Sequence, residues 1–223
     1  GKPRDAIVDA IVAAQRAGEL TTQLLACAGR EQTRPERLQL ATLAAETARL
    51  LKSALPAGCS LELPPSQALP PVVADPTQLR QVVMNLALNA CQAMRGRKGT
   101  LTLRAGTAQL MGEELAGAAT PDRLPAGHYV WVEVEDQGIG MSDATRARIF
   151  DPFFSTRAEG RGLGLPVVLG IVRAHRGALT VRSQPGVGTT FRLYLPQAPD
   201  DAGEPAGALA PAEVPVTTAR DGR

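Results

Sequence analysis

The sequence has few of the residues that usually mark a metal site or a secreted protein. Its 223 residues include two histidines and three cysteines, and Cys27, Cys59 and Cys91 lie far apart, without the spacing of metal ligands. An odd cysteine number suits a reducing cytosol, and we expect all three to be structural. No apolar run approaches the ~20 residues of a membrane span, and no signal-peptide pattern opens the chain. We therefore expect a soluble, cytoplasmic protein without direct membrane contact, although its parent could be membrane-anchored.

The chain also lacks an excess of charge. It has 24 Lys and Arg residues against 22 Asp and Glu residues, a net charge of +2 with both signs dispersed. This balance argues against nucleic acid or a lipid surface as the main partner. Hydrophobic residues make up 44% of the chain, enough for one core with a smaller helical appendage. The chain begins with Gly-Lys-Pro, so we expect it to be a piece of a longer protein.

The two ends of the chain differ from its middle. Apolar residues at helical spacing from Asp5 to Arg30 predict an amphipathic helix. Its apolar stripe needs another helix, in this or another chain, or else packs on the core of a single domain. From 197 to 223 the Ala, Pro, Gly and Asp content without periodicity predicts a linker or tail. The globular domain should therefore run from 34 to 196.

Helices and strands are expected throughout that domain. Asp75-Pro76, an acid at the N-cap and proline at the first helical position, predicts the start of a helix that reaches Met94. A stretch rich in Gly, Ala and Pro, 109–127, predicts a surface excursion. The other expected elements are strands at 37–40, 60–63, 100–105, 129–136, 178–183 and 189–195, and helices at 43–55 and 165–175.

The strand expected at 129–136 ends in an acid followed by two glycines, Asp136, Gly138 and Gly140. A buried carboxylate can accept a hydrogen bond from an exocyclic amine such as that of adenine. Glycines would let the backbone approach the base without an intervening Cβ. This short motif alone also describes an ordinary turn, so its meaning depends on the motifs around it.

A second glycine loop, GRGLGL, contains Gly160, Gly162 and Gly164 and precedes the apolar helix expected from Leu165. Backbone amides freed by glycine at a helix start bind polyphosphate well. The two loops together therefore predict an ATP site.

Asn85 and Asn89 are four residues apart and would project from one face of their helix. Burying an amide is costly unless its hydrogen bonds are used. An amide oxygen is a sensible ligand for Mg²⁺ beside a triphosphate, and we assign Asn89 to the metal. The alternative is that both residues cap loops within the fold.

Three of the four phenylalanines lie in the segment RIFDPFFSTR, 148–157. They form either a satellite hydrophobic cluster or the anchor of a mobile lid that begins at Ser155. Arg157 and Arg161 in that lid could meet phosphate oxygens, although exposed loop arginines are more often solvated.

The ordered set NLALNA, DQGIG, FDPFF, GRGLGL and GVGTTF resembles the N box, the F box and the three glycine boxes of two-component sensor histidine kinases. The resemblance spans about Asp75 to Pro196. It implies the Bergerat-type fold shared with DNA gyrase, mismatch-repair ATPases and heat-shock chaperones. This is an α+β two-layer sandwich, a mixed sheet with helices on one face, preceded here by the amphipathic helix. The implied cofactors are ATP and Mg²⁺.

The resemblance also implies roles for residues of this chain. Asn89 corresponds to the Mg²⁺ ligand and Asp136 to the adenine-binding acid, while Asn85 and Arg161 are candidates for catalytic roles. From the motifs and the resemblance together, the expected ATP-binding residues are Asn85, Asn89, Gln92, Asp136, Gly138, Gly140, Arg157, Gly162, Leu163, Gly164, Leu165 and Thr189.

Two positions differ from parts of the superfamily. The hydrolysing members resemble each other in having Glu where this chain has Asn85, and an amide is no general base, which favours a kinase over an ATPase. Many members have a basic residue where this chain has Gln92, so phosphate contact should fall more heavily on Arg157 and Arg161.

The segment RAGELTTQLLACAGREQ resembles the second helix of the family's dimerisation and phosphoacceptor hairpin, particularly in hybrid kinases. We therefore interpret 1–33 as part of that hairpin and expect the parent to form a homodimer through it. Neither His128 nor His175 matches the phosphoacceptor motif. We expect the acceptor histidine upstream of Gly1, and expect this fragment not to autophosphorylate.

The predicted function is that of the catalytic fragment of a sensor histidine kinase. It would transfer the γ-phosphoryl of ATP to a histidine on a helix absent from this chain, for relay to the aspartate of a response-regulator receiver. The tail after Pro196 fits a hybrid kinase whose receiver follows. The alternatives are a nucleotide-gated interaction module without phosphotransfer and, less favoured because of the hairpin resemblance, an anti-sigma-type serine kinase.

Overall fold

The fold is described from a computed structural model, which describes residues 34–63, 68–111, 119, 124–157 and 162–199. The helix expected before 34, Arg161, and the tail from 200 onward lie outside the described residues.

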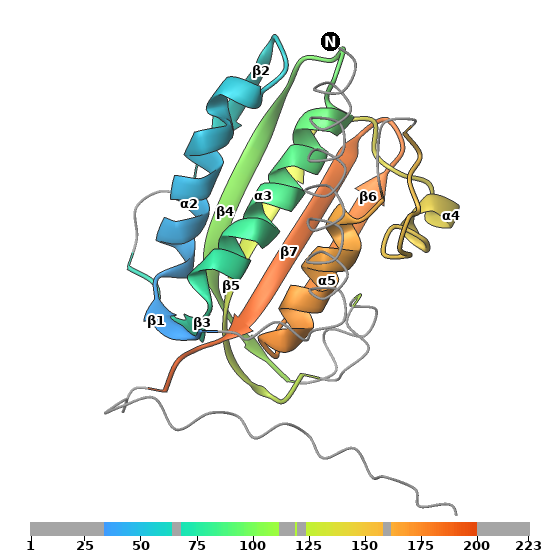
Figure 1. The fold of residues 1–223 in the computed structure, drawn as a ribbon. Coiled ribbons are helices and arrows are strands. Elements are labelled where there is room, and N and C mark those ends of the chain that lie inside the picture. The colour runs from blue at the N-terminus through green and yellow to red at the C-terminus, as the bar shows by residue number, and fades with distance from the viewer. Residues whose placement is uncertain (1–33, 64–67, 112–118, 120–123, 158–161, 200–223) are drawn as a thin grey trace, which may run out of the picture.

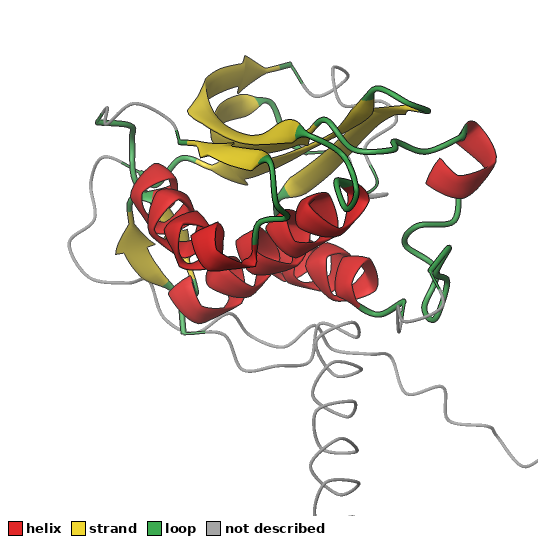
Figure 2. Cartoon of the chain, turned by 90° about the horizontal axis from the view of Figure 1, so that it is seen from above, coloured by secondary structure: helices red, strands yellow, loops and turns green. Residues whose placement is uncertain are grey.

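A five-stranded mixed sheet forms one layer and three helices form the other (Figure 1). Seen from above, the helices cover one face of the sheet (Figure 2). The strand order is β2 (Cys59–Glu62), β4 (Gly99–Leu110), β5 (Gly127–Asp136), β7 (Gly188–Pro196) and β6 (Ala178–Gln184). Only the β2–β4 pair is parallel. The covering helices are α2 (Leu40–Leu50), α3 (Pro76–Ala93) and α5 (Gly164–Ala174). The predicted α+β two-layer sandwich is confirmed.

Alternation along the strands places the core between the two layers. Val130, Val132 and Val134 of β5 are almost fully buried. They pack in one cluster with apolar residues of all three helices, such as Leu86 of α3 and Val168 of α5. The alternation of buried valines along β5 therefore identifies the face of the strand that the helices cover.

The start of α3 follows the predicted signal. The Asp75 carboxylate accepts hydrogen bonds from the backbone N–H groups of Thr77, at 2.8 Å, and Gln78, at 3.1 Å, and also from that of Arg34, at 2.8 Å. Burial raises the pKa of this carboxyl, but the backbone hydrogen bonds outweigh burial and hold it below its usual value. The cap therefore fixes the position of α3 and ties the incoming chain to it.

His175 connects α5 to the same cap. The Asp75 N–H donates to His175 Nε2 at 2.9 Å, so Nδ1 carries the ring proton and donates to the Ile171 carbonyl at 2.8 Å. The ring therefore makes two specific hydrogen bonds, one to the start of α3 and one within α5. Both ring nitrogens of His175 are thus used in packing the helix ends.

Several elements differ from the sequence prediction. The short strand β3 (Val72–Ala74) was not predicted; it pairs with β1 (Glu36–Leu38) as a separate two-stranded sheet. Nor was the one-turn helix α4 (Asp143–Arg146). Strand β4 is longer than the predicted 100–105, and the predicted helix 43–55 is instead α2 followed by the 3-10 turn η1 (Leu51–Ala54). Three-residue strands and single turns are too short to show a period.

The described chain also continues past the boundary expected at 196. The Gln197 N–H donates to the His128 carbonyl at 3.0 Å, and the Ala198 N–H donates to the Pro71 carbonyl at 2.8 Å. Ala198 is 3% exposed. Residues 197–199 therefore pack on the domain.

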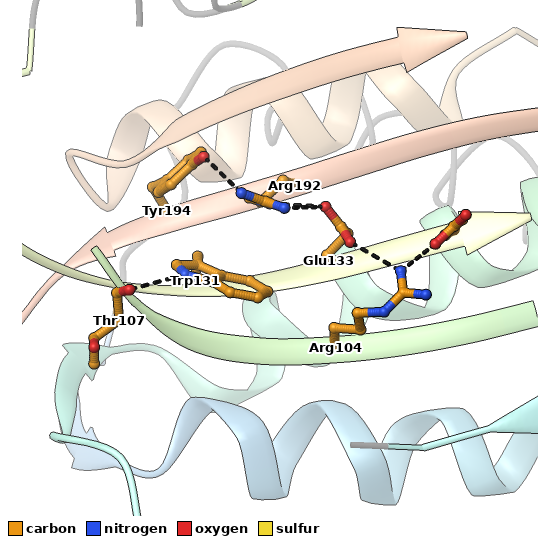
Figure 3. Close-up of polar contacts among 7 residues, drawn as sticks. Arg104, Thr107, Trp131, Glu133, Arg192 and Tyr194 are labelled. Carbon is orange, nitrogen blue, oxygen red and sulfur yellow. Dashed lines mark hydrogen bonds and ion pairs between the residues drawn. The ribbon is translucent and has the colours of Figure 1, made fainter. Parts of the chain in front are cut away.

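The face of the sheet opposite the helices carries a charged network across three strands (Figure 3). Glu133 on β5 is 6% exposed. Its carboxylate lies between Arg192 of β7, whose Nε is 2.8 Å away, and Arg104 of β4, whose Nη1 is 3.2 Å away. The Arg192 guanidinium also lies over the Trp131 ring, 4.4 Å from its centre, and donates to the Tyr194 hydroxyl. A buried acid with two charged donors holds adjacent strands in register.

We expect Glu133→Ala to lower the free energy of unfolding by roughly 2–3 kcal/mol, because it leaves Arg192 facing a buried site without its acid. Chemical denaturation measures this loss, with Glu62→Ala, an exposed acid on edge strand β2, as the control. A loss below about 0.5 kcal/mol would show that Arg192 and Trp131 hold the strands without the acid.

Candidate functional site

A cavity of about 580 Å³ opens between α3, the loops that follow β5, and the start of α5. It collects most of the predicted site residues, although they come from distant parts of the chain. Those that line it are Asn85, Asn89, Gln92, Asp136, Gly140, Arg157, Gly162, Leu163, Gly164, Leu165 and Thr189. Gly138 does not line the cavity, and Arg161 lies outside the described residues.

Asp136 provides the buried charge of this cavity. Asp136 is the last residue of β5 and is 6% exposed. The Gly138 N–H donates a hydrogen bond to its carboxylate at 2.8 Å. Burial raises the pKa of Asp136 to about 6, while hydrogen bonds from the backbone of Gly138 and Thr189 and the charge of Arg157 act in the lowering direction. A strongly perturbed carboxyl in a cavity is typical of a functional group.

The glycines after Asp136 are required by packing of the protein on itself. Gly140 has φ +63°, and a Cβ there would lie 1.9 Å from the Gln184 carbonyl oxygen. A Cβ on Gly138 would lie 2.7 Å from the backbone of Ala93 at the end of α3. We expected these glycines to make room for a base. The structure shows that they let the loop approach α3 and the turn between β6 and β7.

The segment before α5 depends on another close approach. Gly162 has φ +66°, and a Cβ there would lie 2.4 Å from the Phe153 carbonyl carbon. The Phe153 N–H donates to the Gly162 carbonyl at 2.9 Å, and Phe153 itself has φ 67°. The expected phenylalanine cluster is only partly formed, because Phe150 and Phe154 pack against the core whereas Phe153 is 65% exposed.

The cavity-facing side of α3 is polar and half-buried. Asn85 Nδ2 donates to the Gly164 carbonyl at 3.4 Å and so connects α3 to the first turn of α5. Within the described part of the chain, the Asn89 side chain makes no hydrogen bond, so its amide oxygen is free for a ligand. The predicted common face of Asn85 and Asn89 is therefore directed at the cavity.

Arg157 brings a positive charge to the end of α3. Its guanidinium donates to Gln92 Oε1 and, at 3.4 Å, to the Asn89 carbonyl. Burial and the neighbouring Arg95 lower the pKa of Arg157, while Asp136 raises it. Gln92 stands at the position where many family members have a basic residue. Here its side chain instead accepts a hydrogen bond from Arg157, a cation of another segment.

The sequence analysis missed several residues of this region, including Met141 and Thr145 in the cavity lining, and also Ile139 and Arg97. Ile139 lines the cavity although it is 54% exposed, and the Arg97 guanidinium contacts the carbonyls of Gly138 and Gly186. Ile139 could have been predicted, because it lies inside the DQGIG motif. Nothing in the sequence around Arg97 indicates contacts that form only after the chain folds back.

A family model described as "Histidine kinase-, DNA gyrase B-, and HSP90-like ATPase" matches residues 74–199, more than half of the chain. The chain belongs to this family. Among curated proteins, the sensor kinase CckA of Brucella abortus (strain 2308) is 39% identical over 186 residues, 82% of this chain and 19% of that protein. The sensor histidine kinase ZraS of Escherichia coli (strain K12) is 40% identical over 131 residues, 59% of this chain and 24% of that protein. The chain thus spans about a fifth to a quarter of these relatives.

Solved structures agree with this assignment. Full-length ShkA in complex with AMPPNP superposes with a TM-score of 0.65 at 26% identity, over 91% of this chain and 40% of that chain. The catalytic domain of histidine kinase ThkA superposes at 0.55 and 24% identity, over 74% of this chain and 96% of that chain, and supports the fold alone. The chain therefore carries an ATP-binding domain of the kind found in sensor histidine kinases. Among its described helices, none is long and apolar enough to cross a membrane.

We expect Asp136→Asn to stabilise the nucleotide-free domain by about 1–2 kcal/mol at pH 7. The pKa of Asp136 is raised to about 6 from 3.8, so ionising it in the folded protein costs free energy that an amide of the same shape avoids. Because the folded pKa is raised, this cost is fully present above pH 6 and disappears as the pH falls toward 4.

Denaturation of wild type and Asp136→Asn at pH 7, 5 and 4 measures that difference, with Asp143→Asn, an acid 90% exposed, as the control. An Asp136→Asn variant less stable than wild type at pH 7 would mean that the charge is compensated in the folded state.

Proposed function

We propose that this domain binds ATP with Mg²⁺ in the cavity and supplies the γ-phosphoryl group to a histidine on a helix outside the chain. The observation that supports this most strongly is the buried Asp136 carboxylate in a cavity that also holds the Arg157 guanidinium. The carboxylate can accept a hydrogen bond from the amine of the base at one end of a nucleotide, and the guanidinium can bind the phosphates at the other end.

The Asp136 end suits adenine. The carboxylate is fixed by the Gly138 N–H, so its remaining lone pairs can accept from the exocyclic amine. Ile139 and Met141 give this end apolar walls, and Thr189 lies beside the acid on β7. Excluding water from this end strengthens the hydrogen bond to the base.

The other end suits phosphate. Among the described residues no side chain caps the first turn of α5, so the amides of Leu163, Gly164 and Leu165 offer donors at a helix N-terminus that lines the cavity. Arg157, held by Gln92, adds a fixed cation to these amides. Such a set holds phosphate oxygens in line for transfer, which is most of what phosphoryl transfer requires of a protein.

Asn89 is the residue that would hold the metal ion. Asn89 lines the cavity, and the described residues contain no group of three or more His, Cys, Asp and Glu that could form a separate metal site. Mg²⁺ commonly has one or two protein oxygens and completes its shell with phosphate and water, and it neutralises charge on the phosphates. Asn85, an amide bound to Gly164, cannot activate water, which favours transfer over hydrolysis.

The phosphoacceptor is expected outside the described residues. His175 uses both ring nitrogens in packing, and neither His175 nor His128 lines the cavity. We therefore propose that the parent is a homodimer through the segment 1–33, that a histidine upstream accepts the phosphoryl group, and that a response-regulator receiver aspartate takes it next. The proposed location is the cytoplasm, without direct contact with nucleic acid or membrane.

Calorimetry with adenosine, ADP and ATP, the nucleotides with Mg²⁺, should separate the two ends of the site. Asp136→Asn is expected to weaken all three ligands by at least about tenfold, because each contains the base. Arg157→Ala should weaken ADP and ATP by about tenfold and leave adenosine unchanged. Arg173→Ala, an exposed arginine in the last turn of α5 that does not line the cavity, is the control. If wild type bound none of the ligands, or Asp136→Asn had no effect, the proposal would be wrong.

Labelled ATP tests the transfer. We expect the full-length parent to gain an acid-labile label, which is typical of phosphohistidine, while this chain alone stays unlabelled. Acid-stable label would indicate a serine kinase. No label on the parent, with intact ATP binding, would favour a nucleotide-gated interaction module.

A further inference from the structure

Arg97 lies in the turn between α3 and β4, and its exposed side chain reaches two other segments. Nη1 donates to the Gly138 carbonyl at 3.4 Å, and Nη2 donates to the Gly186 carbonyl at 3.2 Å. Gly138 belongs to the loop after β5, and Gly186 to the turn between β6 and β7. One guanidinium thus connects two loops that are far apart in the sequence.

These two loops contact each other through backbone atoms. The Gly186 N–H donates to the Ile139 carbonyl at 2.7 Å. A Cβ on Gly188 would lie 1.9 Å from the Asp136 carbonyl oxygen, just as one on Gly140 would overlap the Gln184 carbonyl. These contacts join backbone atoms, and the Arg97 guanidinium adds side-chain hydrogen bonds to both loops. Small movements of either loop would shift the carboxylate of Asp136.

The main chain of Arg97 is itself anchored. Its N–H donates to the Met94 carbonyl at 3.0 Å, at the end of α3, and its carbonyl accepts from Cys59 Sγ at 3.3 Å, on β2. The planar guanidinium has donors in a fixed fork, which suits two carbonyls at once. The loops are therefore held against a rigid part of the domain.

From this geometry we infer that Arg97 is a positioning residue for the base end of the site, acting through Asp136. The inference rests on the proposed nucleotide binding and adds to it a residue that does not line the cavity. Because Arg97 acts on the loops and not on phosphate, its loss weakens every ligand that contains the base by the same factor.

The test uses Arg97→Met, which keeps the aliphatic stem without donors, and Arg97→Lys, which keeps the charge and can reach one carbonyl. We expect Arg97→Met to weaken adenosine, ADP and ATP equally, by roughly five- to tenfold, and Arg97→Lys to recover part of that loss. Lys98→Met, the loss of the adjacent exposed cation, is the matched control and should change each affinity less than about twofold.

Hydrogen exchange supplies a readout that a general loss of stability would not reproduce. In Arg97→Met the Gly186 amide should exchange faster, while the melting temperature stays within about 2 °C of wild type. Affinities within twofold of wild type, or a loss confined to ADP and ATP, would overturn the role of Arg97. If wild type itself bound no ligand, or Asp136→Asn bound normally, the nucleotide site and the role of Arg97 would both be wrong.

Discussion

Strand β5 ends at Asp136, which is only 6% exposed, and the geometry of the candidate site depends on the position of this buried carboxylate. Burial raises its pKa to about 6, so the folded domain carries a charge that the unfolded chain would solvate better. Such a cost is tolerated at functional sites, where a ligand donor replaces the lost water. The loops around Asp136 pack closely on other segments, because Gly138, Gly140 and Gly188 lie directly against backbone.

The same strand is held from its other face. Glu133, three residues before Asp136, lies between arginines of β4 and β7, while Val130, Val132 and Val134 pack under the helices. Charged contacts on one face and apolar contacts on the other leave β5 little freedom to shift its register. A fixed central strand is a suitable support for a buried acid, because the acid's neighbours are then defined as well.

Most of the fold and of the candidate site could be predicted because their signals are local. The Asp75 cap is one such signal, and the alternation of β5 and the glycine motifs are others; each involves only residues that are close together in the sequence. The missed features lack such a signal. Strand β3 has three residues and depends on β1 for pairing, α4 is a single turn, and Arg97 acts on carbonyls about 40 and 90 positions away.

The order of the motifs along the chain, read without coordinates, determined the family, the layered fold and the residue types at the site. Side-chain chemistry and short-range periodicity are enough for those conclusions. Tertiary structure decided which of the residues are in contact. Arg157 donates a hydrogen bond to Gln92, and Asn89 lines the cavity. Phe153 is exposed, and both ring nitrogens of His175 make hydrogen bonds that pack the helix ends. Those outcomes depend on contacts between distant segments, which one sequence does not encode as a local pattern.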